Sequence, residues 1–207
     1  MIFFIDKLLD GAALETAQTL LADATFVDGA MTSPVGRATK SNLELKVDER
    51  YLKLMSVVDG AVESSDKLAN RLMPRYRTAP IFSRYDTGMY FHEHVDSPMQ
   101  GGQTQAGRSP GRFGQNLIRT DYSMTLFLSP PEGYQGGELE IKIGERTELV
   151  KLAAGSAVCY QTGLPHAVRE VTAGFRTCAV YWFQSLIRDS GVRRTIWDMH
   201  CLERDLR

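Results

Sequence analysis

Two imidazoles and one carboxylate are the side chains of this sequence that could hold a reactive metal ion. His94 and Asp96 are separated by one residue, and His166 follows much later in the chain. In an extended strand successive side chains point to opposite faces, so His94 and Asp96 project from the same face and can bind one ion together. Two nitrogen donors and one oxygen donor leave about three positions of an octahedral ion open, which is typical of non-haem Fe(II) centres. The spacing therefore predicts an iron site that His166 completes.

The sequence around these residues resembles that of known hydroxylases. The run from Tyr85 to Asp96 is similar to the Tyr-x-x-Gly-x-x-Tyr-x-x-His-x-Asp stretch of prolyl 4-hydroxylases. Three later segments look like the bacterial PKHD-type (prolyl/lysyl hydroxylase domain) Fe(II)/2-oxoglutarate-dependent dioxygenases. They are Gly136 to Leu139, His166 to Arg176 and Tyr181 to Asp189. The resemblance covers nearly the whole chain.

The resemblance implies a role for each of five residues. His94, Asp96 and His166 would bind Fe(II), Arg176 would bind the distal carboxylate of 2-oxoglutarate, and Tyr85 would lie near this co-substrate. The type of residue at 176 suits that role, because a planar guanidinium offers two parallel donors to a carboxylate and keeps its charge. The implied enzyme is an oxidoreductase that uses O2 to hydroxylate a substrate. It would release succinate and CO2 and take ascorbate as reductant.

Several alternatives stay open at the level of the sequence. The family name indicates peptidyl proline or lysine, but related enzymes also act on small molecules, so the substrate could be a small molecule or a peptide. The chain could also be a non-catalytic module that senses or binds iron and 2-oxoglutarate, or a zinc or manganese hydrolase built on the same three ligands. Arg176 favours the dioxygenase, since a hydrolase needs no anchor for a second carboxylate.

Two features depart from the family pattern. Phe91 stands where prolyl hydroxylases have a second tyrosine, so any hydrogen bond made by that hydroxyl is absent here. Residues 97–116 form a longer insertion than the pattern has, and their Gly, Gln, Ser and Pro content predicts a long loop. Because this loop follows Asp96 directly, we expect a lid or a substrate contact, with a solvated insertion as the alternative. The candidate contact residues are Arg108, Arg112 and Phe113.

From residue 80 onward the sequence predicts short β-strands separated by turns. The expected strands cover residues 81–85, 89–95, 122–128, 138–143, 147–152, 156–160, 166–171 and 175–183. This pattern predicts a double-stranded β-helix (jelly roll), which can hold a ligand between its sheets. Residues 172–174 should form a turn, so that His166 and Arg176 lie on neighbouring strands.

Helices are predicted on both sides of the strand-rich region. Apolar residues at near-helical spacing indicate helices over 10–24, capped by Asp10, and over about 48–72, and a further helix from Asp189 to the C-terminus. We therefore expect a mainly β fold with flanking α-helices in one domain. It would comprise a helical part over 1–79 that packs on one sheet, a jelly-roll core over 80–185 and a C-terminal helix over 186–207.

Composition limits the classes of partner and compartment. The 207 residues include 24 basic and 25 acidic side chains, so bulk charge gives no reason to expect a nucleic-acid partner. No run approaches the roughly 18 apolar residues of a membrane span, and the N-terminus lacks the basic leader of a signal peptide. Cys159, Cys178 and Cys201 lack Cys-x-x-Cys spacing, which favours reduced thiols in a cytoplasmic protein. The oligomeric state stays open.

Overall fold

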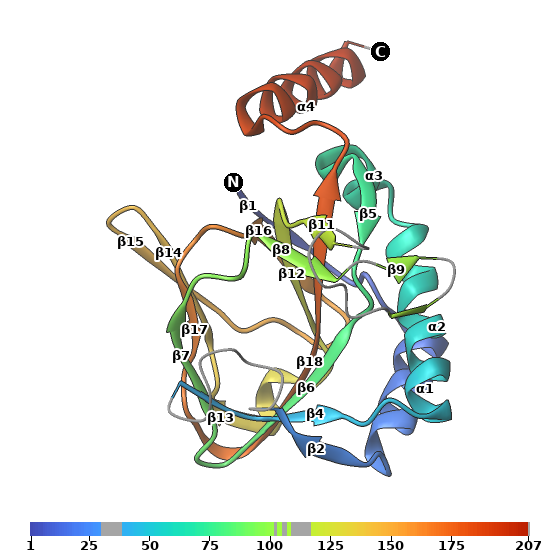
Figure 1. Ribbon diagram of the computed structural model, residues 1–207, viewed down its shortest axis with the longest axis vertical. Helices are drawn as coiled ribbons and strands as arrows, with labels where there is room; N and C mark the ends of the chain where they lie inside the picture. The colour runs from blue at the N-terminus through green and yellow to red at the C-terminus, as the bar shows by residue number, and fades with distance from the viewer. Residues whose placement is uncertain (30–38, 102, 105–106, 109–116, 207) are drawn as a thin grey trace.

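Two antiparallel β-sheets form the centre of the computed structural model, which describes residues 1–29, 39–101, 103–104, 107–108 and 117–206 (Figure 1). The larger sheet has nine strands: β1 (Ile2–Ile5), β2 (Phe26–Asp28), β4 (Leu43–Leu45), β5 (Pro74–Arg77), β6 (Ile81–Asp86), β12 (Tyr122–Phe127), β13 (Tyr134–Gly136), β16 (Ala157–Gln161) and β18 (Val171–Ser185). The smaller sheet has five: β3 (Lys40–Ser41), β7 (Tyr90–His94), β14 (Leu139–Ile143), β15 (Arg146–Val150) and β17 (His166–Val168). The predicted mainly β jelly roll is confirmed.

Strand order brings distant parts of the chain together. The main path of the larger sheet runs β1-β16-β12-β18-β6-β4-β2, with β5 and β13 also paired to β18, and the smaller sheet runs β15-β14-β17-β7-β3. The first 79 residues, for which helices and one N-terminal strand are expected, supply strands to both sheets. β18 lies between β12 and β6 and is the longest strand described, so its inward side chains reach the middle of the fold.

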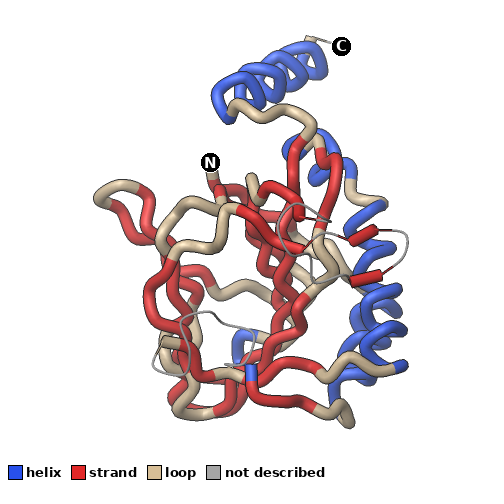
Figure 2. Tube along the Cα trace, viewed as in Figure 1, coloured by secondary structure: helices blue, strands red, loops and turns tan. Residues whose placement is uncertain are grey.

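Alternation along the strands divides the buried side chains into two sets. Phe82 and Leu126 pack on one face of the larger sheet with residues of α1 (Gly11–Ala22) and α2 (Glu49–Glu63), such as Leu54. Residues on the opposite face, such as Phe127, pack against Ile141 of the smaller sheet. The N-terminal helices therefore cover the outer face of one sheet, as Figure 2 shows, and the space between the two sheets is left for other side chains.

The single helix predicted over 48–72 is wrong, because the structure divides it into α2 and α3 (Asp66–Leu72). The side chain of Ser65 accepts a hydrogen bond from the Leu68 amide at 3.3 Å, so a new helix begins at a serine cap inside the apolar pattern. Asp48 caps α2 in the same way, through the Tyr51 amide at 3.0 Å. Asp10 precedes α1 as predicted, but its side chain makes no capping hydrogen bond.

The turn predicted at residues 172–174 is also wrong. β17 ends at Val168, and β18 begins at Val171 and continues through Gly174 to Ser185. Gly174 has a φ of +73°, and a Cβ there would collide with the carbonyl of Gly133, so glycine at this position permits close pairing with β13 and does not mark a turn. His166 and Arg176 consequently lie on facing sheets and not on neighbouring strands.

The C-terminal helix forms as predicted. α4 (Ser190–Asp205) begins after Asp189, whose side chain accepts a hydrogen bond from the Val192 amide at 2.8 Å, and the helix projects away from the sheets (Figure 1). Among the described residues no helix is long and apolar enough to cross a membrane.

The predicted 97–116 loop contains short strands. Within it, β9 (Gln103–Thr104) pairs with β10 (Gly107–Arg108), and β8 (Met99–Gly101) pairs with β11 (Leu117–Arg119), which follows the loop. The candidate lid contacts, Arg112, Phe113 and the side chain of Arg108, lie outside the described residues.

Candidate active site

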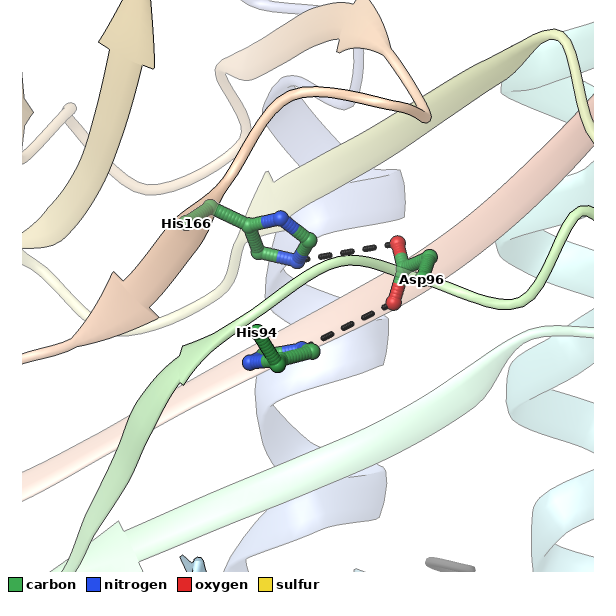
Figure 3. A group of neighbouring side chains, drawn as sticks. All are labelled: His94, Asp96 and His166. Atoms are coloured by element: carbon green, nitrogen blue, oxygen red, sulfur yellow. Dashed lines mark ion pairs between the residues drawn. The ribbon is translucent and has the colours of Figure 1, made fainter.

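The three predicted metal ligands meet where β7 and β17 pair (Figure 3). His94 is the last residue of β7 and lies directly opposite His166, the first residue of β17, while Asp96 lies just beyond β7. Asp96 Oδ1 is 3.7 Å from His94 Nε2, and Asp96 Oδ2 is 3.6 Å from His166 Nε2. The three ligand atoms lie within 4.8 Å of one another, so one small ion can contact all three.

Backbone carbonyls determine which imidazole nitrogens face Asp96. His94 Nδ1 lies 2.8 Å from the carbonyl oxygen of His92, and His166 Nδ1 lies 2.9 Å from that of Leu164. A carbonyl can only accept, so each Nδ1 must carry the proton and each Nε2 must keep its lone pair in the neutral ring. Metal-bound histidines are held by hydrogen bonds of this kind. Both rings are therefore prepared to donate to a cation.

Asp96 receives two further hydrogen bonds from the larger sheet. Ser123 Oγ on β12 and Trp182 Nε1 on β18 each donate to Asp96 Oδ2 at 2.8 Å, and these two residues are directly paired across the strands. Burial would raise the pKa of Asp96, but hydrogen bonds and charge from the two histidines, Trp182 and Ser123 lower it overall. The side chain is therefore a carboxylate with one oxygen fixed by donors.

The sequence pattern alone indicates no role for Ser123 or Trp182. Trp182 lay inside a segment that carried the family resemblance, whereas Ser123 had no signal at all, because its proximity to Asp96 depends on pairing between the sheets.

His166 is suited to stay neutral. Burial is the largest cause, and with the neighbouring His94 it lowers the pKa of His166 below its ordinary value of 6.5, although Asp96 opposes this shift. Neutral imidazole is the form that binds metal ions. The electrostatics of the site thus agree with its hydrogen bonds.

A cavity between the two sheets contains the three ligands. The empty space in it, the open mouth included, amounts to about 510 Å³. Tyr85 and Arg176 line the same cavity, so the structure brings all five residues predicted for the site together. Apolar walls come from both sheets, through Ile81, Phe91, Leu139, Val168 and Val180.

Arg176 is a buried cation inside this cavity. It is 1% exposed, lies opposite Tyr85 in the β18–β6 register and donates from Nη1 to Cys178 Sγ at 3.2 Å. The guanidinium carbon is 5.2 Å from the ring centroids of both Tyr85 and Phe127. Burial disfavours its charge, yet the pKa of Arg176 is raised, because Cys178, Tyr85 and Tyr134 are acidic groups around it.

No carboxylate neutralises Arg176 within the described part of the chain, and its Nε, though buried, has no hydrogen-bond partner there. A buried charge without a counter-ion is costly, so the position suits an anionic ligand that enters the cavity.

His92 does not join the site through its ring. Simple alternation along a strand would place it on the same face as His94, but its side chain is exposed and only its backbone carbonyl reaches His94.

The chain is similar to known Fe(II)-dependent oxygenases, which agrees with the geometry of the site. Residues 80–184 match the model of the 2OG-Fe(II) oxygenase superfamily. A PKHD-type hydroxylase of Gloeothece citriformis is 33% identical over 205 residues, which cover 99% of this chain and 87% of the relative. A PKHD-type hydroxylase of Caulobacter sp. strain K31 is 38% identical over 182 residues, covering 87% of this chain and 76% of the relative.

Solved structures share the fold. A prolyl hydroxylase from Trichoplax adhaerens, in complex with a peptide fragment of the hypoxia inducible factor oxygen degradation domain, superposes with a TM-score of 0.63 and 16% sequence identity. The match covers 88% of this chain and 82% of that chain. At this identity the likeness establishes the architecture.

Proposed function

The chain belongs to the 2OG-Fe(II) oxygenase superfamily, and we propose that it hydroxylates its substrate at an Fe(II) ion held by His94, Asp96 and His166. Membership and the names of its relatives make the protein an oxidoreductase, a 2-oxoglutarate-dependent dioxygenase of the PKHD hydroxylase type. Fe(II), 2-oxoglutarate and O2 are the cofactor and co-substrates that this family implies.

One observation carries the assignment of the ligands: two Nε2 atoms and a carboxylate converge within 4.8 Å while both Nδ1 atoms are engaged by carbonyls. This mixed set of nitrogen and oxygen donors suits Fe(II), whereas a thiolate set would favour zinc or iron–sulfur clusters. Bound there, the ion would supply the redox chemistry with O2 that protein side chains lack.

The chain's own residues would orient the reactants and exclude water. Arg176 would bind the distal carboxylate of 2-oxoglutarate through its guanidinium, and Tyr85, in contact with that guanidinium, would border the co-substrate. Ser123 and Trp182 would keep Asp96 oriented. In the overall reaction we expect substrate, 2-oxoglutarate and O2 to give hydroxylated substrate, succinate and CO2.

Succinate formation tests this proposal. Protein loaded anaerobically with Fe(II) is exposed to O2 with 2-oxoglutarate, with and without a pool of metabolites and peptides. We expect succinate that increases with the pool and falls to background in Asp96→Ala, because that variant loses one of three metal ligands. If protein with verified iron and 2-oxoglutarate binding forms no succinate, the proposed dioxygenase activity is wrong. That result would favour a non-catalytic module that senses iron and 2-oxoglutarate.

The remaining expectations are proposals of the same kind. The substrate would be a small molecule or a peptide, the latter supported by the peptide complex of the Trichoplax prolyl hydroxylase. Ascorbate would keep the iron reduced.

We propose one domain over residues 1–207, because strands from the first 79 residues pair within the sheets of the core, as β1 does with β16. Three free cysteines support a cytoplasmic location.

A further inference from the structure

A second group of side chains stands behind the candidate metal centre. The Phe91 ring stacks on the His94 imidazole, with centroids 3.7 Å apart and an interplanar angle of 13°. The Lys40 ammonium lies 5.5 Å from the Phe91 centroid and forms an ion pair with Glu44 Oε1 at 2.6 Å. Lys40 and Phe91 both line the cavity. A charged group, an aromatic ring and a proposed ligand thus lie in consecutive contact.

An irregularity in β7 makes this stack. Phe91 and His94 are three residues apart, so a regular strand would point them to opposite faces. In the pairing with β17, however, His94 faces His166 and Phe91 faces Val168, so three steps on β7 correspond to two on β17. The extra residue is a β-bulge, which returns Phe91 to the face of His94 and leaves His92 and Glu93 exposed. Bulges near active sites commonly re-aim a side chain in this way.

The ion pair joins β3, at the edge of the smaller sheet, to β4 of the larger sheet beside the stack. Lys40 on β3 lies directly opposite Phe91 on β7, and Glu44 on β4 lies directly opposite Ser83 on β6. Lys40 is 7% exposed and Glu44 is 8% exposed, so the pair is largely removed from water. Buried ion pairs contribute little net stability compared with apolar packing, so stability alone gives little reason for this pair at the cavity wall.

His94 has more need of such support than His166. The His94 side chain is 16% exposed and that of His166 is 6% exposed, and Tyr160 packs edge-on against His166 at 5.1 Å. A histidine ring rotates over a broad range about its last side-chain torsion. The bond from Nδ1 to the His92 carbonyl restrains His94, and the parallel Phe91 ring blocks rotation out of the plane.

We propose that Phe91 and Lys40 are positioning residues of the metal centre, which hold the His94 ring in its metal-binding orientation. Phe91 acts on His94 directly, and Lys40, fixed by Glu44, holds the Phe91 ring against it. This inference rests on the proposed function, because it takes His94 as a ligand. It concerns metal binding and not the 2-oxoglutarate anchor, which comes from the other sheet.

Binding of Co(II) to metal-free protein tests the inference without catalysis. We would measure the Kd for Co(II) by competition with a chelator, and record the visible absorption of the bound ion, which depends on ligand geometry. Phe91→Leu should raise the Kd about 10- to 100-fold, the usual cost of losing a group that orients a metal ligand, and should change the absorption bands. Phe91→Tyr keeps the aromatic ring, so it should leave both the Kd for Co(II) and the absorption bands close to those of the wild type. Lys40→Met combined with Glu44→Gln should raise the Kd less, roughly two- to fivefold.

Phe175→Leu is the matched control, because Phe175 also stacks with a cation, Arg84, but on β18 away from the cavity. It should leave the Kd and the spectrum unchanged. Thermal unfolding checks that each variant folds, and Phe91→Met, which keeps the apolar volume, replaces Phe91→Leu if the latter does not. If the folded Phe91 variant has the wild-type Kd and spectrum, the positioning role of Phe91 is wrong, but the proposed function still stands. Co(II) binding by wild type no tighter than by Asp96→Ala would overturn the proposed function with it.

Discussion

The two ends of the cavity are built in different ways. At the metal end, His94 and His166 are end residues of short strands in the smaller sheet and Asp96 lies just beyond β7; the His94 side chain remains partly exposed, whereas His166 is buried. At the other end, Arg176 projects from the interior of β18, opposite Tyr85 of β6, and has almost no exposure. A metal centre must admit O2 and substrate, and a position at strand ends leaves one ligand, His94, partly exposed. An anchor for a carboxylate needs only one fixed charge, and that charge acts most strongly where water is absent.

The groups that hold these residues in place also differ between the two ends of the cavity. At the metal end, each ligand is oriented by a specific hydrogen bond: carbonyls hold the two histidines, and Ser123 and Trp182 hold Asp96. Arg176 is instead enclosed by aromatic rings and one thiol. The difference predicts that variants at one end will impair metal binding and variants at the other will impair co-substrate binding.

Arg176→Met should separate the two ends most clearly. The variant removes the buried cation and keeps an apolar side chain of similar length, so the distal carboxylate of 2-oxoglutarate loses its partner. Loss of one partner from a buried charge pair costs about 2–5 kcal/mol, which corresponds to a Kd for 2-oxoglutarate raised roughly 30-fold or more. Isothermal titration of the Mn(II)-loaded protein measures this, with the Kd for Mn(II) as the internal control. A rise in both constants would contradict the separation.

Trp182→Phe should affect the metal end alone. It removes the Nε1 donor to Asp96 Oδ2 while keeping an aromatic ring, and groups that orient metal ligands contribute about 10- to 100-fold to metal affinity. We expect the Kd for Mn(II) to rise within that range. Trp197→Phe, in α4, is the matched control, since Trp197 packs on Arg71 outside the cavity. Equal effects of the two substitutions would show that the Asp96 bond has no special role.

The smallest expected effect is a pH dependence of stability that arises at the metal end. Because burial lowers the pKa of His166 in the folded state, the unfolded chain binds its proton more readily. The free energy of unfolding of the metal-free protein should therefore decrease as pH falls through about 6.5, the ordinary histidine value. Chemical denaturation at about pH 7.5 and about pH 5.5 measures the slope. His166→Gln should flatten it, whereas His200→Gln, on α4, should not; an unchanged slope in His166→Gln would refute the assignment.

Local patterns in the sequence were enough to name five residues that the structure brings together in one cavity. His94 and Asp96 lie within one motif, and His166 and Arg176 lie in segments with a family resemblance, so short-range spacing carries their identity. The strand-rich region and the jelly roll followed from alternation and turn signals, because these depend on neighbouring residues.

Features that depend on pairing between strands could not be predicted in this way. The bulge in β7 shows only in its register with β17, and it moves His92 outward and Phe91 inward against simple alternation. Gly174 indicated a turn until its close approach to β13 was known. Ser65 interrupts an apolar pattern that continues on both sides, so the cap between α2 and α3 had only a weak local signal.

The long strand β18 contributes a residue to each end of the cavity, so it fixes the distance between the ends. Trp182, which holds Asp96, and Arg176 are six positions apart on it, an even number, so both side chains face inward. The span between the metal support and the anchor is thus set by the repeat of one continuous strand. Insertion or deletion of a single residue between them would turn one of the two toward the helices and uncouple the ends. The stretch of β18 between Arg176 and Trp182 can therefore change length only in steps of two residues if both side chains are to stay in the cavity.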